Sequence, residues 1–161
     1  DCCPICHNTI FPTPPTDFVF RKRTGDYWCT YDGFYIVSEK FKQFCELHKY
    51  PNLTFTPIRK SSGYYFFMTN EIIKMDYDRS GVKLLNKREC CDNYDVVLGN
   101  LEFRAKDETV HVKDFIARAE LFMGSGNRKT PLICVGLETA KLMKEYGLTE
   151  IYFRDVYEPY D

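Results

Sequence analysis

The sequence predicts an α+β protein in which a mixed sheet carries helices, with two β-α-β pseudo-repeat units and an N-terminal cysteine knuckle. Three observations lead to this prediction. A strand-helix-strand pattern over residues 34–58 recurs over residues 132–156. Between these units, residues 63–104 are rich in aromatic and β-branched side chains, which favour strands. The eight cysteines include two tight clusters. The length of 161 residues indicates a single domain, residues 1–161.

The first 30 residues are predicted to form a Cys- and Pro-rich knuckle followed by a hairpin. Pro12, Pro14 and Pro15 exclude a helix or a central strand around them. Residues 17–20 have the pattern of a short strand, and the basic, glycine-containing turn 21–26 follows. We expect residues 27–30 to pair back across that turn.

The unit at 34–58 starts with an apolar strand over residues 34–37. Ser38 then suits the position before a helix, because its side-chain oxygen can accept a hydrogen bond from the first helical turn. Apolar residues follow at helical spacing, namely Phe41, Phe44 and Cys45. Pro51 ends the helix, and residues 53–58 form the next strand.

Residues 132–156 repeat this pattern 98 positions later without a gap, so that Val37 aligns with Val135 and Phe44 with Leu142. A strand over 132–135 precedes a helix that Gly147 ends. Ile151, Phe153 and Val156 are predicted to form the closing strand. Two units of equal length made from such different residues indicate one shared local structure.

The segment 63–104 is predicted to supply central strands and to carry the second cysteine cluster. Its last two strands, 94–98 and 101–104, are expected to form a hairpin around Gly99 and Asn100. Residues 111–123 have apolar side chains at helical intervals, including Phe115, Ile116, Ala119 and Phe122. We therefore expect a helix over 111–123, ended by the glycine-containing segment 124–127.

The cysteine clusters predict a zinc site. Cys3 and Cys6 have the C-x-x-C spacing, which allows two thiolates to share one tetrahedral ion. Cys90 and Cys91 are the natural suppliers of the remaining ligands, although neighbouring side chains in a strand point to opposite faces. One of them could therefore act with His7 or Cys29. Unligated thiols and a disulfide remain open alternatives, whereas Cys45 and Cys134 fit buried thiols.

Catalytic readings of the same residues have weaker support. A redox dithiol usually has its first cysteine at a helix N-terminus, and the residues after Cys6 lead into prolines instead. The three histidines, His7, His48 and His111, show no spacing typical of a catalytic constellation. We therefore expect a protein that is not an enzyme.

Charge and hydropathy narrow the range of partners. The net charge of −1 gives no basic field for nucleic acid. No stretch approaches the ~20 apolar residues that span a bilayer, so we expect no membrane contact. The clustering of the cysteines favours a reducing compartment, and we therefore expect a cytoplasmic protein. Acidic clusters and nearby tyrosines suit a basic protein partner instead, and a solvated acidic surface without a partner is the open alternative. The candidate contacts are Asp76, Asp78, Asp92, Asp95, Tyr77, Tyr94, Tyr157 and Tyr160.

Several motifs together resemble a known family. They are the Cys3–Cys6 motif followed by prolines, the segments 17–20 and 36–41, and the closing run from Leu132 through Gly147 to Val156. They resemble the double-CXXCG and related immunity proteins, which are encoded beside bacterial polymorphic or contact-dependent toxins. His7 departs from this pattern, because it stands where a glycine would follow the first pair, and the Cys90-Cys91-Asp92 sequence replaces the second C-x-x-C-G.

The resemblance implies a non-enzymatic protein that binds and neutralises one cognate toxin, by steric occlusion. It also implies that the two cysteine pairs, Cys3 with Cys6 and Cys90 with Cys91, hold a metal, for which we expect zinc. Two alternatives differ in class: a zinc-ribbon-like module that binds nucleic acid, suggested by the basic run 21–23, and a dithiol oxidoreductase.

Overall fold

The computed structural model describes residues 3–6, 13–21, 24–91, 93–99, 103–106, 113–126, 128–154 and 156–157. One sheet has four strands in the order β1-β2-β4-β3, and every pair of neighbours is antiparallel. Its strands are β1 (Tyr27–Cys29), β2 (Tyr35–Ser38), β3 (Leu53–Pro57) and β4 (Tyr64–Thr69).

The second sheet has the order β10-β9-β7-β6, and β5 also pairs with β9. Its strands are β5 (Ile72–Ile73), β6 (Lys83–Lys87), β7 (Tyr94–Leu98), β9 (Ile116–Ser125) and β10 (Arg128–Val135). This sheet is mixed, because β5 runs parallel to β9 whereas the other neighbours are antiparallel. A separate parallel pair joins β8 (Phe103–Arg104) to β11 (Val156–Tyr157). The predicted α+β class with a mixed sheet is confirmed.

The first β-α-β unit forms as predicted. β2 leads directly into α1 (Glu39–Leu47), and β3 follows in the same sheet with β4 between them. The Ser38 side chain accepts a hydrogen bond of 3.1 Å from the Phe41 backbone N–H. This contact satisfies one of the N–H groups that the first turn of a helix leaves without a partner.

The second unit repeats the strand and the helix but not the closing strand. β10 leads through Gly136 into α2 (Leu137–Glu145). Residues 151–154 form no strand, and β11 pairs with β8 outside the main sheets. In the first unit the closing strand pairs with the far edge of β4, which is the neighbour of β2. The matching edge of β9 is already occupied by β5 and β7, so 151–154 has no backbone edge to join.

The helix predicted over 111–123 is wrong for the described part of that range. Residues 116–125 form β9, which pairs along its length with β10 and on its other edge with β5 and β7. Its apolar residues lie on both faces of the strand, and such a short apolar run fits a strand as well as a helix. The backbone pairing with β10 decides between them. Gly124 and Ser125 are paired residues at the end of β9, and Gly126 lies in the turn that follows.

The two hairpins predicted at 17–30 and 94–104 do not form, because their strands pair with other segments. β1 pairs with β2, and residues 17–20 form no strand. They are held instead by Ser61, whose side chain accepts from the Phe20 N–H at 2.8 Å and donates to the Phe20 carbonyl at 2.9 Å. β7 pairs with β6 and β9, whereas β8 pairs with β11. The pairing expected around Gly99 is therefore replaced by longer-range contacts.

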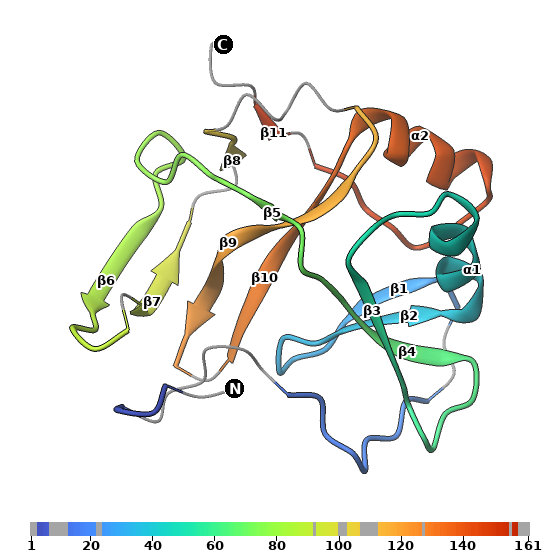
Figure 1. Ribbon diagram of the computed structural model, residues 1–161, viewed down its shortest axis with the longest axis horizontal. Coiled ribbons are helices and arrows are strands. Elements are labelled where there is room, and N and C mark those ends of the chain that lie inside the picture. Colours follow the sequence, from blue (N-terminus) through green and yellow to red (C-terminus); the bar gives the residue numbers. More distant parts are fainter. Residues whose placement is uncertain are drawn as a thin grey trace.

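The four-stranded sheet is covered on both faces. Val37 and Phe67 point to the face that carries the helices, where they pack with Phe44 of α1 and Met143 of α2. Ile36, on the opposite face, packs with Phe66, Phe18 and Phe20. Figure 1 shows the two helices together at one end of the molecule and the β6–β7 hairpin at the other. β6 is exposed at four of its five positions, so this edge strand contributes little to the apolar core.

Candidate metal centre

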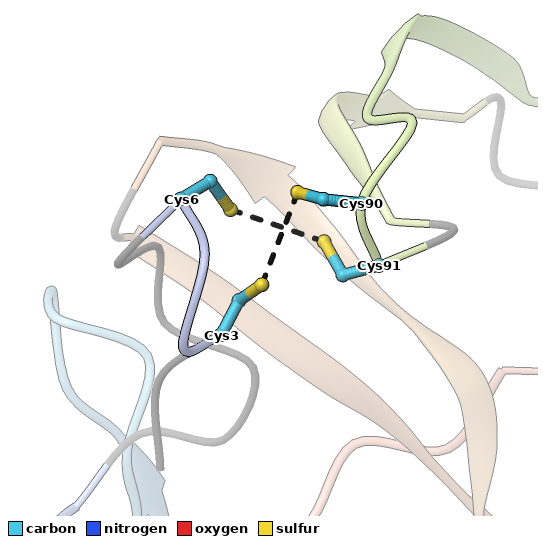
Figure 2. Close-up of side chains that lie close together, drawn as sticks. All are labelled: Cys3, Cys6, Cys90 and Cys91. Atoms are coloured by element: carbon cyan, nitrogen blue, oxygen red, sulfur yellow. Dashed lines mark hydrogen bonds between the residues drawn. The ribbon is translucent and has the colours of Figure 1, made fainter.

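Four cysteine side chains from two distant turns point toward one another (Figure 2). Cys3 and Cys6 flank a turn at Pro4 and Ile5, and Cys90 and Cys91 lie in the turn between β6 and β7. That turn is closed by a hydrogen bond of 2.7 Å from the Arg88 N–H to the Asn93 carbonyl. The strict alternation of side chains applies to strands, and a turn frees Cys90 and Cys91 to converge.

The four sulfur atoms all lie within 4.8 Å of one another. The Cys3 and Cys90 sulfurs are 3.9 Å apart, and those of Cys6 and Cys91 are 4.0 Å apart. A disulfide would need about 2.05 Å. A tetrahedral ion bound to sulfur at about 2.3 Å would separate its ligands by about 3.8 Å. The cluster therefore has the spacing of a closed four-sulfur metal site and could hold one metal ion.

The hydrogen bonds within the cluster have opposite effects on the two neighbouring cysteines. The Asn93 backbone N–H lowers the pKa of the Cys91 thiol, because it donates to the sulfur and favours the thiolate. Contact with Cys6, followed by burial, raises the pKa of Cys90. Bound metal would replace the protons that these sulfurs share, since metal ligation requires thiolates.

Polar residues that the sequence analysis missed surround the cluster. The Arg88 Nε donates to an Asp95 oxygen at 2.6 Å, and the Arg88 side chain also contacts Cys91. Lys129 of β10 donates to the Tyr94 carbonyl close to the same turn. Arg88 and Asn93 each lie two residues from a cluster cysteine, so their position in the sequence was a usable signal. Nothing in the sequence marks Lys129.

The remaining described cysteines lie outside this cluster. Cys29 is exposed and donates to the Thr30 carbonyl, so it is not the additional ligand considered from the sequence. His7, the other such ligand, lies outside the described residues. Cys45 and Cys134 are buried, as predicted, and burial raises the pKa of each to about 12.

Two of the predicted partner contacts make internal hydrogen bonds. Asp76 accepts from the Arg79 N–H at 3.0 Å and so shapes its own turn. The Tyr77 hydroxyl accepts from the Leu121 N–H at 3.1 Å, and burial raises the pKa of this tyrosine. Asp78, between them and Ser80, is exposed. Asp78 is therefore the member of this segment with the freest access to a partner.

The other candidates are divided between the cluster surroundings and the C-terminal end. Tyr94 and Asp95 begin β7 beside the cluster, where they contact Lys129 and Arg88. Tyr157 belongs to β11. Asp92 and Tyr160 lie outside the described residues. A partner for any of these side chains remains a prediction.

Neither a search for membrane-spanning helices nor a comparison with known proteins assigns a function to this site. Within the described ranges, no helix combines the length and the apolar character needed to cross a membrane. No protein-family model, curated protein or solved structure matches the chain.

Proposed function

We propose that this protein binds one zinc ion at Cys3, Cys6, Cys90 and Cys91, and that it acts without catalysis by binding and occluding a bacterial toxin. The observation that carries the metal assignment is the convergence of four sulfurs within 4.8 Å. The toxin-binding role is supported by the resemblance of the motifs to immunity proteins. Reduced thiols at this spacing suit a reducing compartment, so we propose the cytoplasm as the site of action.

Zinc is the metal that best suits this donor set. Thiolates select soft or borderline ions, and a tetrahedral set of four sulfurs is typical of structural zinc. Four protein ligands also leave no coordination position for a substrate. The ion would therefore act as a staple between the N-terminal turn and the β6–β7 turn, which are 87 residues apart from Cys3 to Cys90.

The metal assignment is tested by elemental analysis of protein purified under reducing conditions. We expect about one zinc per chain in the unmodified protein, because a closed four-cysteine site holds one ion. Cys90→Ser should lose the metal, and Cys29→Ser, which changes an exposed cysteine outside the cluster, should keep it. Purified protein without metal, or equal metal content in both variants, would contradict the assignment.

Removal of the metal should weaken the fold at one end. A cross-link that closes a loop of this length stabilises a protein by about 4.6 kcal/mol in the chain-entropy model. Chelation should lower the free energy of unfolding by a similar amount. Hydrogen exchange should increase first at residues 3–6 and 88–93, and the helical core around Phe44 should remain protected.

The proposed role requires a toxin gene next to the gene of this protein, and it is tested by co-expression with the toxin domain that such a neighbouring gene encodes. We expect growth to be rescued and the purified pair to form a stoichiometric complex. Inhibition should rise linearly to one equivalent, as occlusion requires. Inhibition by much less than one equivalent would indicate catalysis, and absence of a complex would contradict the role.

The acidic surface offers a variant for the same assay. Asp78→Lys places a positive charge at an exposed position, and we expect the association rate to fall on the order of tenfold against a basic partner. Asp32→Lys, at another exposed position, is the matched control. Equal rates for the two variants would remove this segment from the interface.

A further inference from the structure

Two cationic side chains approach the cysteine cluster from different strands. Arg88 follows β6, contacts Cys91 and interacts electrostatically with Cys6, and its side chain is only 10% exposed. Lys129 comes from β10, is half-buried, and interacts electrostatically with Cys91. The two residues are 41 positions apart in the sequence, so the fold brings them together at the sulfurs.

Placing these cations side by side is costly without further negative charge. Lys129 donates to the carbonyl of Tyr94, the residue before Asp95, and so lies beside the Arg88–Asp95 ion pair. Asp95 is one carboxylate shared between them, with an oxygen 2.6 Å from the Arg88 Nε and a weaker attraction to Lys129. Within the described part of the chain, the two cations and the carboxylate that they share leave an excess positive charge beside the four sulfurs. A divalent ion held by four thiolates carries a net charge of −2 and would balance it.

We propose that Arg88 and Lys129 are positioning residues that balance the charge of the metal centre and stabilise its four thiolates. This inference rests on the proposed metal site. Arg88, which follows β6, attracts the Cys91 and Cys6 thiolates, and Lys129 of β10 attracts the Cys91 thiolate. The Asn93 N–H to the Cys91 sulfur belongs to the same shell. Such outer contacts orient ligands and increase metal affinity.

The experiment measures zinc affinity by competition with a chelator, at constant pH and salt, for the full chain and its variants. Arg88→Gln should weaken zinc binding by about 10- to 100-fold, the usual cost of losing an outer-shell partner. Arg88→Lys keeps the charge and should recover most of the affinity. Lys129→Gln should also weaken binding, and the double variant should be weaker than either single one.

Two controls separate charge balance from a merely structural role. Lys83→Gln removes an exposed lysine from β6 and should bind zinc as the unmodified protein does. Asp95→Asn removes the carboxylate that competes with the metal centre for Arg88 and leaves both cations, so the zinc affinity should not fall. Unfolding of the metal-free variants should match that of the unmodified metal-free protein, because the proposed role requires bound metal.

Three results would overturn the inference. Zinc binding by Arg88→Gln that is as tight as that of the unmodified protein would remove any role of Arg88 at the metal. Asp95→Asn and Arg88→Gln losing affinity equally would assign the effect to their ion pair. A metal-free Arg88→Gln protein destabilised as much as the metal-bound one would assign it to folding. If the unmodified protein binds no zinc, the proposed metal site itself fails, which is a separate outcome.

Discussion

The two strand-helix units follow the same backbone path and then diverge. α1 and α2 both have nine residues and begin 98 positions apart, at Glu39 and Leu137. The same spacing relates the positive φ angles of Lys49 (56°) and Gly147 (78°), and those of Asn52 (56°) and Glu150 (60°). The difference comes afterwards, where the first unit continues into β3. Local residues thus suffice for strand, helix and turn, whereas the closing strand requires a free sheet edge.

The units also hold each other through two aspartates with reciprocal roles. Asp26 accepts from the Ser38 hydroxyl at the start of α1 (2.6 Å) and from the Thr149 N–H after α2 (2.9 Å). Asp114 accepts from the Thr139 hydroxyl in the first turn of α2 and from the Tyr50 hydroxyl after α1, both at 2.7 Å. Each aspartate therefore joins the beginning of one helix to the end of the other.

The largest expected difference between the units lies in their helix cores. Phe44 is fully buried, and its counterpart Leu142 is partly buried. Phe44→Ala should cost about 3–5 kcal/mol, because it removes a ring from the middle of the core. Leu142→Ala should cost about 2 kcal/mol, since it buries less area. Denaturant unfolding of both variants measures this difference, and equal losses would show that the two helices share the core equally.

Loss of the Asp26 bridge should reduce the free energy of unfolding more than loss of the Asp114 bridge. Asp26 is buried, with 7% of its surface exposed, whereas Asp114 is exposed. Asp26→Ala leaves the Ser38 and Thr149 donors without an acceptor and should lower the free energy of unfolding by about 2–3 kcal/mol. Asp114→Ala should cost about 1 kcal/mol because water can replace the lost contacts. A larger loss for Asp114→Ala would reverse the proposed ranking.

The residues immediately before the two helices, Ser38 and Gly136, also differ between the units. Ser38→Ala should cost about 1–2 kcal/mol by removing the side-chain cap of α1. The counterpart Gly136 has no side-chain cap, yet Gly136→Ser should also destabilise the protein. A Cβ at Gly136 would lie 2.2 Å from the Lys113 carbonyl oxygen. Thermal unfolding of the two variants checks this, and stabilisation by Gly136→Ser would show that residue 113 can move.

The smallest effects are expected at the turns after the helices, with opposite signs. Gly147→Ala should lower the free energy of unfolding by about 1 kcal/mol, because a side chain disfavours a positive φ. Lys49→Gly, at the matching position, should raise the free energy of unfolding by up to about 1 kcal/mol, since glycine adopts this conformation freely. Denaturant midpoints for the pair would measure the difference, and a loss in both variants would indicate that the Lys49 side chain stabilises the turn.

The parts of the fold that depend on neighbouring residues were predictable from the sequence. Ser38, the apolar spacing after it, and Gly147 determine the first unit and most of the second. β9 was not predictable, because Phe115, Ile116, Ala119 and Phe122 fit a helix as well as a strand and only the pairing with β10 decides. The two-residue pairing of β8 with β11 joins segments that are far apart in the sequence, and such short strands carry no periodic signal.

The same distinction applies to the candidate metal site. The C-x-x-C spacing identified Cys3 and Cys6, and the second pair followed from the number of ligands that zinc requires. The objection to adjacent ligands assumed a strand at Cys90 and Cys91, whereas the structure has a turn. Lys129 could not be found in advance, because it reaches the cluster only through the β9–β10 hairpin. Arg88 belongs to no motif, and its distance of two residues from Cys90 is the only sign of its role in the sequence.

The separation of the two cysteine pairs also affects synthesis of the chain. Cys6 and Cys91 are 85 residues apart, so the ribosome makes the first pair well before the second. At common elongation rates this interval is roughly 4–17 s. During that time Cys3 and Cys6 are without the other two cysteines of the cluster. For the proposed zinc site, the yield of correctly assembled protein in cells should therefore depend on the redox state and on the zinc supply during translation.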